Sequence, residues 1–310
     1  MLNLYRRSVL GVAGLAPVKS LMERHGWRLG ARRFVAGEDP RQALPALAEL
    51  RASGRQVLVD VLGEYVTSAA AAQAMAREVA TTITTLAQAG IAPVVSVKPS
   101  QLGLALDPDL AAEGVLALAL QAEAAAGKLA LDMEDARYVD ATLALLQGTW
   151  RGGARRTSGV LQAYLHRTPA DLAALLAAAP DPAALEVRLV KGAYAERPEL
   201  TLTDMGAIRR AFVELAESAW RAGAQVNVAT HDERLINEAA AFARGAALPP
   251  GKLEFQLLYG VKPKLQQALV AAGHQVRIYV PVGRDWYGYF SRRLAERPTN
   301  LALVVRGLFG

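Results

Sequence analysis

The feature that most constrains this chain is a regular alternation of short apolar runs with long segments rich in alanine and leucine. Each short run holds five to seven residues rich in Val, Ile, Leu and Tyr. The eight runs, taken as predicted strands, are residues 56–62, 92–97, 128–133, 159–165, 186–190, 224–229, 253–259 and 275–280. Most are nearly continuous in apolar character, as expected for strands buried on both faces. The alternation indicates βα units around a parallel sheet.

The intervening segments carry helix signals. Residues 67–89 are rich in alanine and end at Gly90, and Asp107-Pro108 begins a run that ends at Gly127. Later helices are predicted to begin at Thr168-Pro169, at Thr203-Asp204 and at Asp232. These are capping residues, first-turn prolines and terminal glycines in the positions that helices favour.

Eight strands, each followed by a helix, are typical of an α/β fold of the closed (β/α)8 TIM barrel type. A doubly wound open sheet gives a similar pattern and remains the alternative. The barrel is assigned to residues 56–310. Residues 1–55 are predicted to form extra N-terminal helices packed outside it, with a break at residues 37–40 and an amphipathic helix at residues 9–18.

Composition limits the chemistry. The chain has no cysteine, which excludes disulfides, zinc-thiolate sites and iron–sulfur clusters. Its four histidines show no metal-ligand spacing, so we expect no metal. Hydrophobic residues make up 52% of the chain and charged residues 21%, which favours one folded body without long disordered segments. The lack of cysteine also fits a cytoplasmic location.

The net charge of +6 is concentrated at the amino terminus, where seven Arg or Lys accompany a single acid, Glu23, in residues 1–33. This asymmetry suggests an anionic partner surface. Aromatic residues are only 6% of the chain, so we expect no nucleic acid but peripheral contact with the inner face of a cell membrane. A solvated basic helix is an equal alternative. No apolar run reaches the roughly 20 residues of a membrane-spanning helix, and nothing in the sequence indicates an oligomeric state.

Polar residues gather where the predicted strands end, which is where barrels of this kind place their active sites. They are Glu64, Lys98, Asp132, Glu134, Gln162, Tyr164, Arg188, Lys191, Tyr194, Thr230, His231, Asp232, Tyr259 and Tyr279. Any one of them could form a buried ion pair, such as Lys98 with Asp132. Their convergence from most strands on one barrel mouth is better explained by a polar ligand.

The last predicted helix carries a sharper pattern. At 100° per residue, Tyr289, Arg292, Arg293 and Glu296 fall within an arc of about 100°. Adjacent guanidinium groups repel each other unless an anion lies between them, and their planar donors match a carboxylate. The alternative is an exposed basic face with an i,i+4 pair of Arg292 and Glu296. No glycine-rich dinucleotide fingerprint and no Walker A loop is present.

These segments together resemble a known family. The segments are Arg188-Leu-Val-Lys191-Gly192-Ala193-Tyr194, Leu161-Gln162-Ala-Tyr164, Ala229-Thr230-His231 and Tyr289 through Glu296. They are similar to the proline dehydrogenases, most of all to the short monofunctional bacterial enzymes, and also to the dehydrogenase domain of bifunctional proline utilisation proteins. The resemblance extends in order from about Gln56 to Asn300. Ala195 departs from it, because many bifunctional relatives have tryptophan there.

The resemblance implies a distorted barrel whose last helix lies over the mouth, with a non-covalent FAD over the strand ends. By this resemblance Arg292, Arg293 and Lys98 hold the carboxylate of L-proline. The proline ring would be enclosed by Tyr279, Tyr289, Tyr194 and Leu257, with Asp132 holding Tyr279 in place. Glu296 would support the flavin or the arginine pair, and Glu64 belongs to the same expected site.

The same resemblance assigns cofactor contacts. Arg188 would lie near flavin N5, and the rest of the cofactor would be held by Val190, Lys191, Gly192, Ala193, Gln162, Thr230 and His231. The implied reaction is oxidation of L-proline to Δ1-pyrroline-5-carboxylate by hydride transfer to N5, with a membrane quinone as electron acceptor. Such a reaction needs orientation of substrate and cofactor, but no nucleophile and no metal.

Two other functions are consistent with the residues alone. Lys191 on a barrel strand could form a Schiff base with a carbonyl substrate, as in class I aldolases. The chain could also be a non-enzymatic anion-binding or scaffold protein. Borohydride trapping would support the aldolase, whereas a yellow protein would contradict both.

Overall fold

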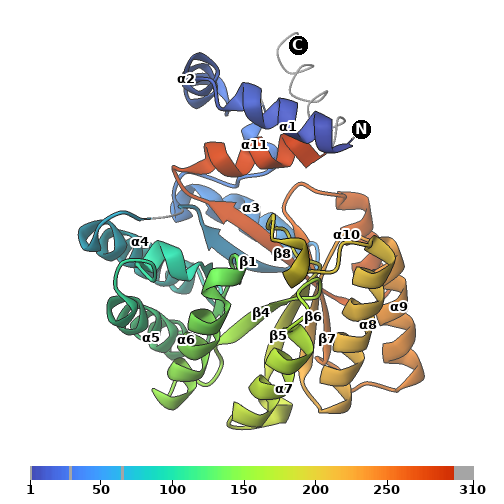
Figure 1. Ribbon diagram of the computed structural model, residues 1–310. Helices are drawn as coiled ribbons and strands as arrows, with labels where there is room; N and C mark the ends of the chain where they lie inside the picture. Colours follow the sequence, from blue (N-terminus) through green and yellow to red (C-terminus); the bar gives the residue numbers. More distant parts are fainter. Residues whose placement is uncertain (1, 28–29, 64–65, 297–310) are drawn as a thin grey trace.

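The predicted strands all form, and in the computed structural model they close into a parallel barrel in chain order from β1 to β8 (Figure 1). The structure describes residues 2–27, 30–63 and 66–296. The strands are β1 (Gln56–Val61), β2 (Val94–Val97), β3 (Lys128–Leu131), β4 (Ser158–Gln162), β5 (Glu186–Val190), β6 (Gln225–Ala229), β7 (Leu253–Leu258) and β8 (Gln275–Val282). Pairing of β1 with β8 closes the barrel and excludes the open sheet. The predicted (β/α)8 fold is confirmed.

Helices follow the strands and surround the barrel (Figure 1). They are α4 (Ala69–Gln88), α5 (Pro108–Ala124), α6 (Val139–Arg151), α7 (Thr168–Ala178), α8 (Met205–Arg221), α9 (Glu233–Gly245), α10 (Pro263–Ala271) and α11 (Trp286–Glu296). Short 3-10 turns are η2 (Pro99–Leu102), η3 (Ala136–Tyr138), η4 (Pro182–Ala184) and η5 (Pro198–Leu200). Asp107, Asp204 and Asp232 cap α5, α8 and α9 through side-chain oxygens, as their sequence positions predicted.

The end of α5 differs from the prediction in one respect. The residue in the left-handed conformation is Ala126, with φ of 58°, and not Gly127. Gly127 is needed for a different reason, because a Cβ atom there would lie 2.0 Å from the carbonyl oxygen of Pro93. The glycine therefore permits close approach of two backbones at the start of β3.

Four elements precede the barrel: α1 (Leu2–Ala13), α2 (Ala16–His25), η1 (Ala31–Arg33) and α3 (Pro40–Ala52). The single helix predicted over residues 9–18 is wrong, because Leu15 is extended and Pro17 lies in the first turn of a new helix. α3 packs on the barrel core through Ala43, Leu47 and Leu50. By contrast, α1 lies alongside α11 (Figure 1).

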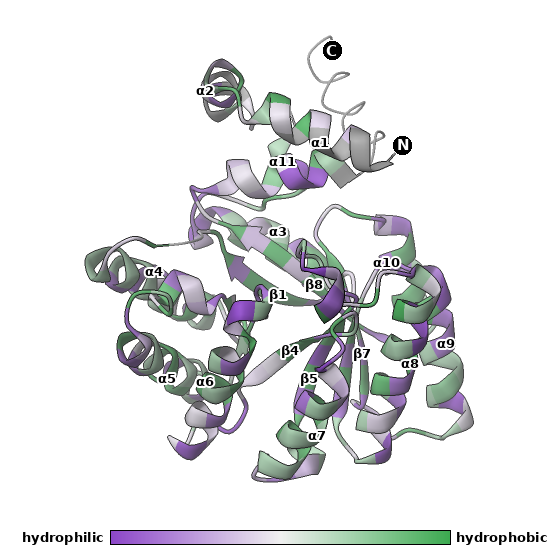
Figure 2. Cartoon of the chain, in the orientation of Figure 1, coloured by the Kyte–Doolittle hydropathy of each residue, from purple (hydrophilic) through white to green (hydrophobic). Residues whose placement is uncertain are grey.

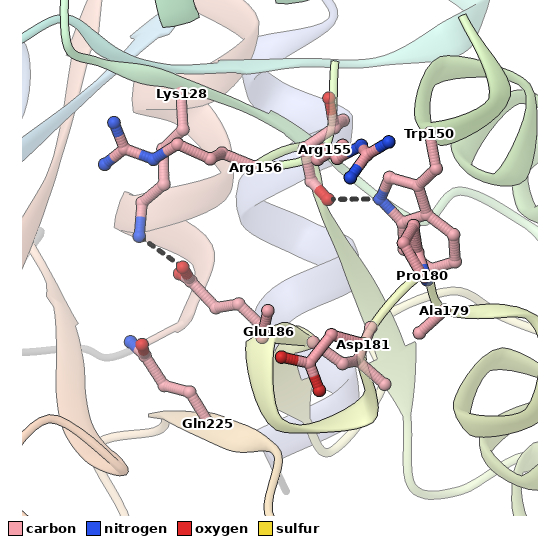
Figure 3. Close-up of a pocket in the computed structure, with 12 residues that line it drawn as sticks. Lys128, Trp150, Arg155, Arg156, Ala179, Pro180, Asp181, Glu186 and Gln225 are labelled. Atoms are coloured by element: carbon pink, nitrogen blue, oxygen red, sulfur yellow. Dashed lines mark hydrogen bonds and ion pairs between the residues drawn. The ribbon is translucent and has the colours of Figure 1, made fainter. Parts of the chain in front are cut away.

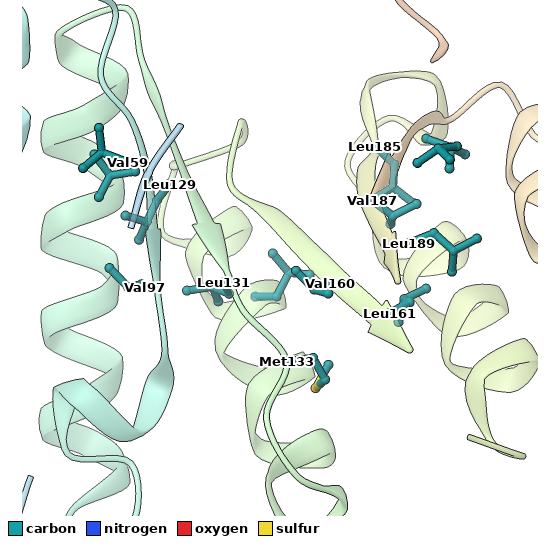
Figure 4. Packing of buried hydrophobic residues seen from close by; sticks show 14 of the residues in the cluster. Val59, Val97, Leu129, Leu131, Met133, Val160, Leu161, Leu185, Val187 and Leu189 are labelled. Carbon is teal, nitrogen blue, oxygen red and sulfur yellow. The ribbon is translucent and has the colours of Figure 1, made fainter. Parts of the chain in front are cut away.

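The main core lies between the barrel and its helices. Strand residues that point outward form it, among them Val59, Val97, Leu129, Leu131 and Leu189 (Figure 4). Alternate residues on each strand point inward, as the period of two requires. None of the helices in the described chain is both long and apolar enough to span a bilayer.

The inner face of the barrel is more polar on one side than on the other. On β1 to β3, Leu58, Val94 and Ala130 form a small apolar cluster, and Asp60 and Ser96 are polar. On β5 to β8 most inward positions before the strand ends are polar, among them Glu186, Arg188, Asn227, Glu254, Gln256 and Arg277. Figure 2 accordingly shows hydrophilic colour on β5 and β7 inside the barrel. The nearly continuous apolar character expected of most strands thus holds for β2, apart from Ser96, but not for β5 or β7.

Candidate active site at the barrel mouth

Four polar residues predicted to lie near one another meet inside the mouth, the end of the barrel where the strands finish. Asp132 accepts hydrogen bonds from the Tyr279 hydroxyl at 2.6 Å and from the Arg188 guanidinium. The Lys98 ammonium lies 3.8 Å from the same carboxylate. Arg188 also lies over the ring of Tyr279, with 5.2 Å between the guanidinium carbon and the ring centroid. These contacts join β2, β3, β5 and β8.

A fifth residue of this cluster, and its fourth charged group, was missed in the sequence. Asp60 on β1 is 1% exposed, and its carboxylate lies 3.2 Å from the Lys98 ammonium. The signal was available, since a lone acid inside the run Val57-Leu-Val-Asp-Val61 requires a buried partner. It was missed because Asp60 lies within its strand and not after it. Two carboxylates and two cations therefore alternate in the cluster: Asp60, Lys98, Asp132 and Arg188.

Burial and pairing act differently on the ionisable groups of this cluster. Burial raises the pKa of Asp132, but the charges of Arg188 and Lys98 and the hydrogen bonds from Tyr279 and Ser96 together lower it by more, so the pKa lies below its ordinary value. Burial also raises the pKa of Asp60, and there the Lys98 ammonium does not outweigh it. Burial and then Asp132 raise the pKa of Tyr279 well above its ordinary value. Tyr279 is therefore a hydrogen-bond donor at neutral pH, and Asp132 is an anion.

Residues at the ends of β4, β5 and β6, or directly after them, belong to the adjacent part of the mouth. Gln162 donates its side-chain amide to the carbonyl oxygen of Glu134 at 2.9 Å, which leaves its own oxygen as an acceptor. The Lys191 ammonium lies 3.3 Å from Asp232. Thr230 is buried and accepts a hydrogen bond from the backbone of Asp232 at 3.1 Å.

His231 and Gly192 also stabilise the local structure after β6 and β5. The Nε2 atom of His231 accepts the backbone N–H of Leu258 at 3.2 Å, which ties β6 to β7. Gly192 has φ of 115°, and a Cβ atom there would lie 2.1 Å from the ring of Tyr164. Only glycine fits this position, since both the backbone angle and the buried ring exclude a side chain. Val190 and Tyr194 are half-buried beside it, and Ala193 is exposed.

The last helix presents the aromatic and cationic residues expected of it. Tyr289 is 7% exposed, and the Arg293 guanidinium carbon lies 5.1 Å from the centroid of its ring. Arg292 and Arg293 are both half-buried. The side chain of Glu296 and all of Glu64 lie outside the described residues.

The placement of Leu257 beside the substrate is wrong. Leu257 is 1% exposed and belongs to the core between barrel and helices. Gln256 and Leu258 occupy the inward positions of β7, and Leu258 pairs in register with Tyr279. Because alternate residues face opposite sides, Leu258 is the residue that this strand offers to the mouth.

A hollow lies at the other end of the barrel. It has a volume of about 470 Å³ and is lined by residues at the starts of β3, β5 and β6, including Lys128, Glu186 and Gln225 (Figure 3). Lys128 and Glu186 form an ion pair with each other. Active sites of β/α barrels lie at the carboxyl ends of the strands, so the mouth remains the candidate site.

The comparison that decides the family is the match of residues 43–305 to the model of the proline dehydrogenase family. The chain belongs to the proline dehydrogenase family. Curated relatives agree with this assignment. The chain is 39% identical over 312 aligned residues to the proline dehydrogenase of Deinococcus radiodurans, covering 99% of this chain and 98% of the relative. It is 35% identical to proline dehydrogenase 2 of Bacillus subtilis strain 168, covering 91% of each.

Solved structures of bifunctional proteins show the same fold. The chain superposes on proline utilization A of Bdellovibrio bacteriovorus with a TM-score of 0.78 and 24% identity, covering 85% of this chain and 32% of that one. For the Bradyrhizobium japonicum protein the TM-score is 0.71 and the identity 25%, covering 87% and 31%. The expectation of an oxidoreductase of the proline dehydrogenase family, related to both kinds of protein, is confirmed.

The surroundings of Lys191 argue against the alternative function, a Schiff-base aldolase. A Schiff-base lysine has to react as an uncharged amine. In this proline dehydrogenase family member, Lys191 forms an ion pair with Asp232, which is also bonded by Arg209 at 2.8 Å. The family assignment points to the same conclusion.

Proposed function

We propose that this protein oxidises L-proline to Δ1-pyrroline-5-carboxylate, with FAD as hydride acceptor at N5 and a membrane quinone as the final electron acceptor. The observation that carries the proposal is the cluster of Lys98, Asp132, Arg188 and Tyr279 inside the mouth of a proline dehydrogenase barrel. Bound FAD supplies the two-electron chemistry that no amino-acid side chain provides.

The donor set at the mouth suits such a cofactor. Arg188 provides a buried cation, Lys191 and Arg209 gather further positive charge after β5, and Gln162 offers an acceptor. Gly192 lets the chain turn tightly against the ring of Tyr164 directly after β5. Arg188 would lie near N5, and Val190 to Ala193, Gln162, Thr230 and His231 would hold the remainder.

The substrate is recognised by its charge and shape. Arg292 and Arg293 on α11, together with Lys98, would bind the proline carboxylate, since paired guanidinium groups match two carboxylate oxygens. Tyr279, Tyr289, Tyr194 and Leu258 would enclose the ring and exclude water. Asp132 holds the hydroxyl of Tyr279 at 2.6 Å and so keeps one wall in place. Glu296 and Glu64 would support the arginine pair or the cofactor. The protein's part is thus orientation and charge stabilisation.

The basic amino-terminal segment supports the proposal that the enzyme works at a membrane surface. The cations of residues 1–33 would bring the enzyme to the anionic inner face of the cell membrane, where quinone is dissolved. The enzyme would then be cytoplasmic and peripheral to that surface.

A visible spectrum tests the proposal directly. Protein purified with flavin supplied should absorb near about 450 nm, and L-proline added without oxygen should bleach that band. Protein that stays colourless under these conditions would contradict the cofactor, and a yellow protein unaffected by proline would contradict the substrate.

A further inference from the structure

A buried ion pair deeper in the barrel has no direct part in the site described above. Glu254 on β7 is 2% exposed, and Arg277 on β8 donates to both its carboxylate oxygens, at 2.8 and 2.9 Å. Arg277 also donates to the carbonyl oxygen of Val57 at 2.9 Å. Removing two charges from water is costly, and apolar residues could fill the same space. The pair therefore invites a functional explanation.

One side chain connects this pair to the mouth. Gln256 lies two residues after Glu254 on the same inward face, and its Nε2 donates to Glu254 at 2.8 Å. Its Oε1 accepts the Nε–H of Arg188 at 2.7 Å. Arg188 is consequently held from two sides, by Gln256 on Nε and by Asp132 on a terminal nitrogen.

The orientation of the Gln256 amide decides whether this contact is favourable. A guanidinium has donors only, so Gln256 must present its oxygen and not its NH2 group to Arg188. A carboxylate has acceptors only, so the NH2 group must face Glu254. Burial raises the pKa of Glu254, but the charge and hydrogen bonds of Arg277, with smaller effects of Lys128 and Gln256, together lower it by more, so that Glu254 is an anion at neutral pH. Glu254 thereby permits one amide orientation and excludes its flip.

We propose that Glu254 is a positioning residue for Arg188, acting through the amide of Gln256. Arg277 serves this arrangement by holding the Glu254 carboxylate in place. The importance of Arg188 rests on the proposed function, which places it beside the cofactor, but the positioning itself does not. If the pair of Glu254 and Arg277 only stabilised the barrel, its loss would leave the side chain of Arg188 where it is.

The barrel offers a matched control for that purely structural role. Lys128 and Glu186 form a second ion pair at the amino ends of β3 and β5, and Glu186 also accepts a hydrogen bond from Asn227. The charge of Glu186 acts on Arg277, but the hydrogen bonds of Glu186 in the described chain go to Lys128 and Asn227 and not to Gln256 or Arg188. Glu186→Gln therefore disrupts an ion pair inside the same barrel while the hydrogen bonds of the Gln256 amide stay in place.

Hydrogen exchange of the Arg188 Nε–H, followed by NMR, tests the positioning directly. The signal is assigned by its loss in Arg188→Lys. Glu254→Gln should speed exchange at this group by about tenfold or more, because a neutral amide at position 254 allows the flip. Glu186→Gln should change it by less than about twofold. Equal effects of the two variants, or no effect of Glu254→Gln, would overturn the proposal.

Two further variants keep the test decisive if Glu254→Gln folds poorly. Gln256→Met keeps the pair of Glu254 and Arg277 but removes the acceptor, so it should speed exchange at Arg188 as well. The double variant E254Q/Q256E puts the carboxylate against Arg188 and the amide beside it. It should restore slow exchange without restoring thermal stability, since Arg277 still lacks its carboxylate. Unchanged exchange in Gln256→Met, or fast exchange in the double variant, would contradict the proposal that Glu254 positions Arg188 through Gln256.

Kinetics with proline then connect the positioning to the reaction. Glu254→Gln and Gln256→Met should lower kcat/KM by about tenfold or more, because small displacements of orienting groups are costly. Glu186→Gln should lower it by less than about twofold. A protein without flavin or proline turnover would refute the proposed function, while the exchange measurements would still decide the role of Glu254.

Discussion

At the scale of single residues, the mouth of this barrel contains buried charges. Their burial is tolerated because positive and negative groups alternate. Asp132 lies between two cations and Lys98 between two carboxylates, so each group faces an opposite charge in place of water. An incoming anion therefore meets a site that is locally neutral. Lys98 alone therefore does not give the mouth a net positive charge, and Arg292 and Arg293 on the last helix would supply the further charge that selects a carboxylate.

Arg293→Lys should raise KM for proline, because lysine keeps the charge but loses the planar fork that matches a carboxylate. The expected loss in kcat/KM is on the order of 2 to 4 kcal/mol, with flavin content nearly unchanged. Steady-state kinetics measure it, and Arg221→Lys, in an exposed pair with Glu217, is the matched control. Arg292→Lys should behave similarly. If both lysine variants kept the wild-type KM, Arg292 and Arg293 would not be the residues that bind the carboxylate.

Asp132→Asn should destabilise the protein more at neutral pH than at acid pH. The folded pKa of Asp132 lies below its ordinary value of about 4, so its ionised form stabilises the fold. That contribution is complete above pH 4 or so and is lost as pH falls through the lower folded value. Urea unfolding of both proteins at pH 7 and pH 3 measures the difference. A larger difference at pH 3 would show that the ionised carboxylate is not what stabilises the fold.

At the scale of elements, α11 is held from outside the barrel as well as from within it. Trp286 is 2% exposed and lies in a cluster with Phe34 and Phe290. Its ring centroid is 5.6 Å from that of Trp27, and the Tyr5 hydroxyl donates to the Leu294 carbonyl at 3.0 Å. The amino-terminal helices therefore position the helix that carries the arginine pair.

Trp286→Ala should destabilise the protein by about 3 to 5 kcal/mol and also raise KM for proline, because the cavity loosens α11. The matched control is Trp220→Ala. Trp220 is 5% exposed and stacks on Phe242 at 5.3 Å, away from the mouth. Both variants should lose stability in urea unfolding, but only Trp286→Ala should change KM in the protein that remains folded. If the two variants had the same KM, the packing of α11 would have no influence on substrate binding, and the prediction would be wrong.

At the scale of the whole molecule, positive charge and exposed apolar surface occur together near the amino terminus. Val12, near the end of α1, and Leu15, between α1 and α2, are 56% and 55% exposed. Arg24 and Arg32 nearby in sequence are exposed as well. Basic groups beside apolar side chains are the combination that binds the surface of an anionic bilayer.

Binding to anionic vesicles should therefore be salt-sensitive and depend on this end of the chain. Arg24→Glu combined with Arg32→Glu should weaken sedimentation with phosphatidylserine vesicles, since both changes oppose the surface charge. Arg151→Glu combined with Arg244→Glu makes the same change of net charge at exposed sites elsewhere. Equal weakening by both pairs, or no binding by the wild type, would refute the membrane role.

Much of this arrangement could be predicted from the sequence. The eight strands, the barrel and the polar residues at the mouth follow from periodicity and from the rule that barrel sites lie at strand ends. The capping aspartates of α5, α8 and α9 were predicted because a cap depends on neighbours only a few residues away. The break between α1 and α2 was missed, because a first-turn proline was taken as part of one continuous helix.

The sequence by itself determined which residues share a face of each strand, because side chains alternate with a period of two. It could not determine which of the two faces points inward, and so Leu257 was chosen where Leu258 is the inward residue. Only barrel closure decided that choice, together with the pairing of Asp60 with Lys98 and the chain of contacts from Arg277 to Arg188. These contacts join strands distant in sequence, and no local pattern encodes the partner of a buried charge.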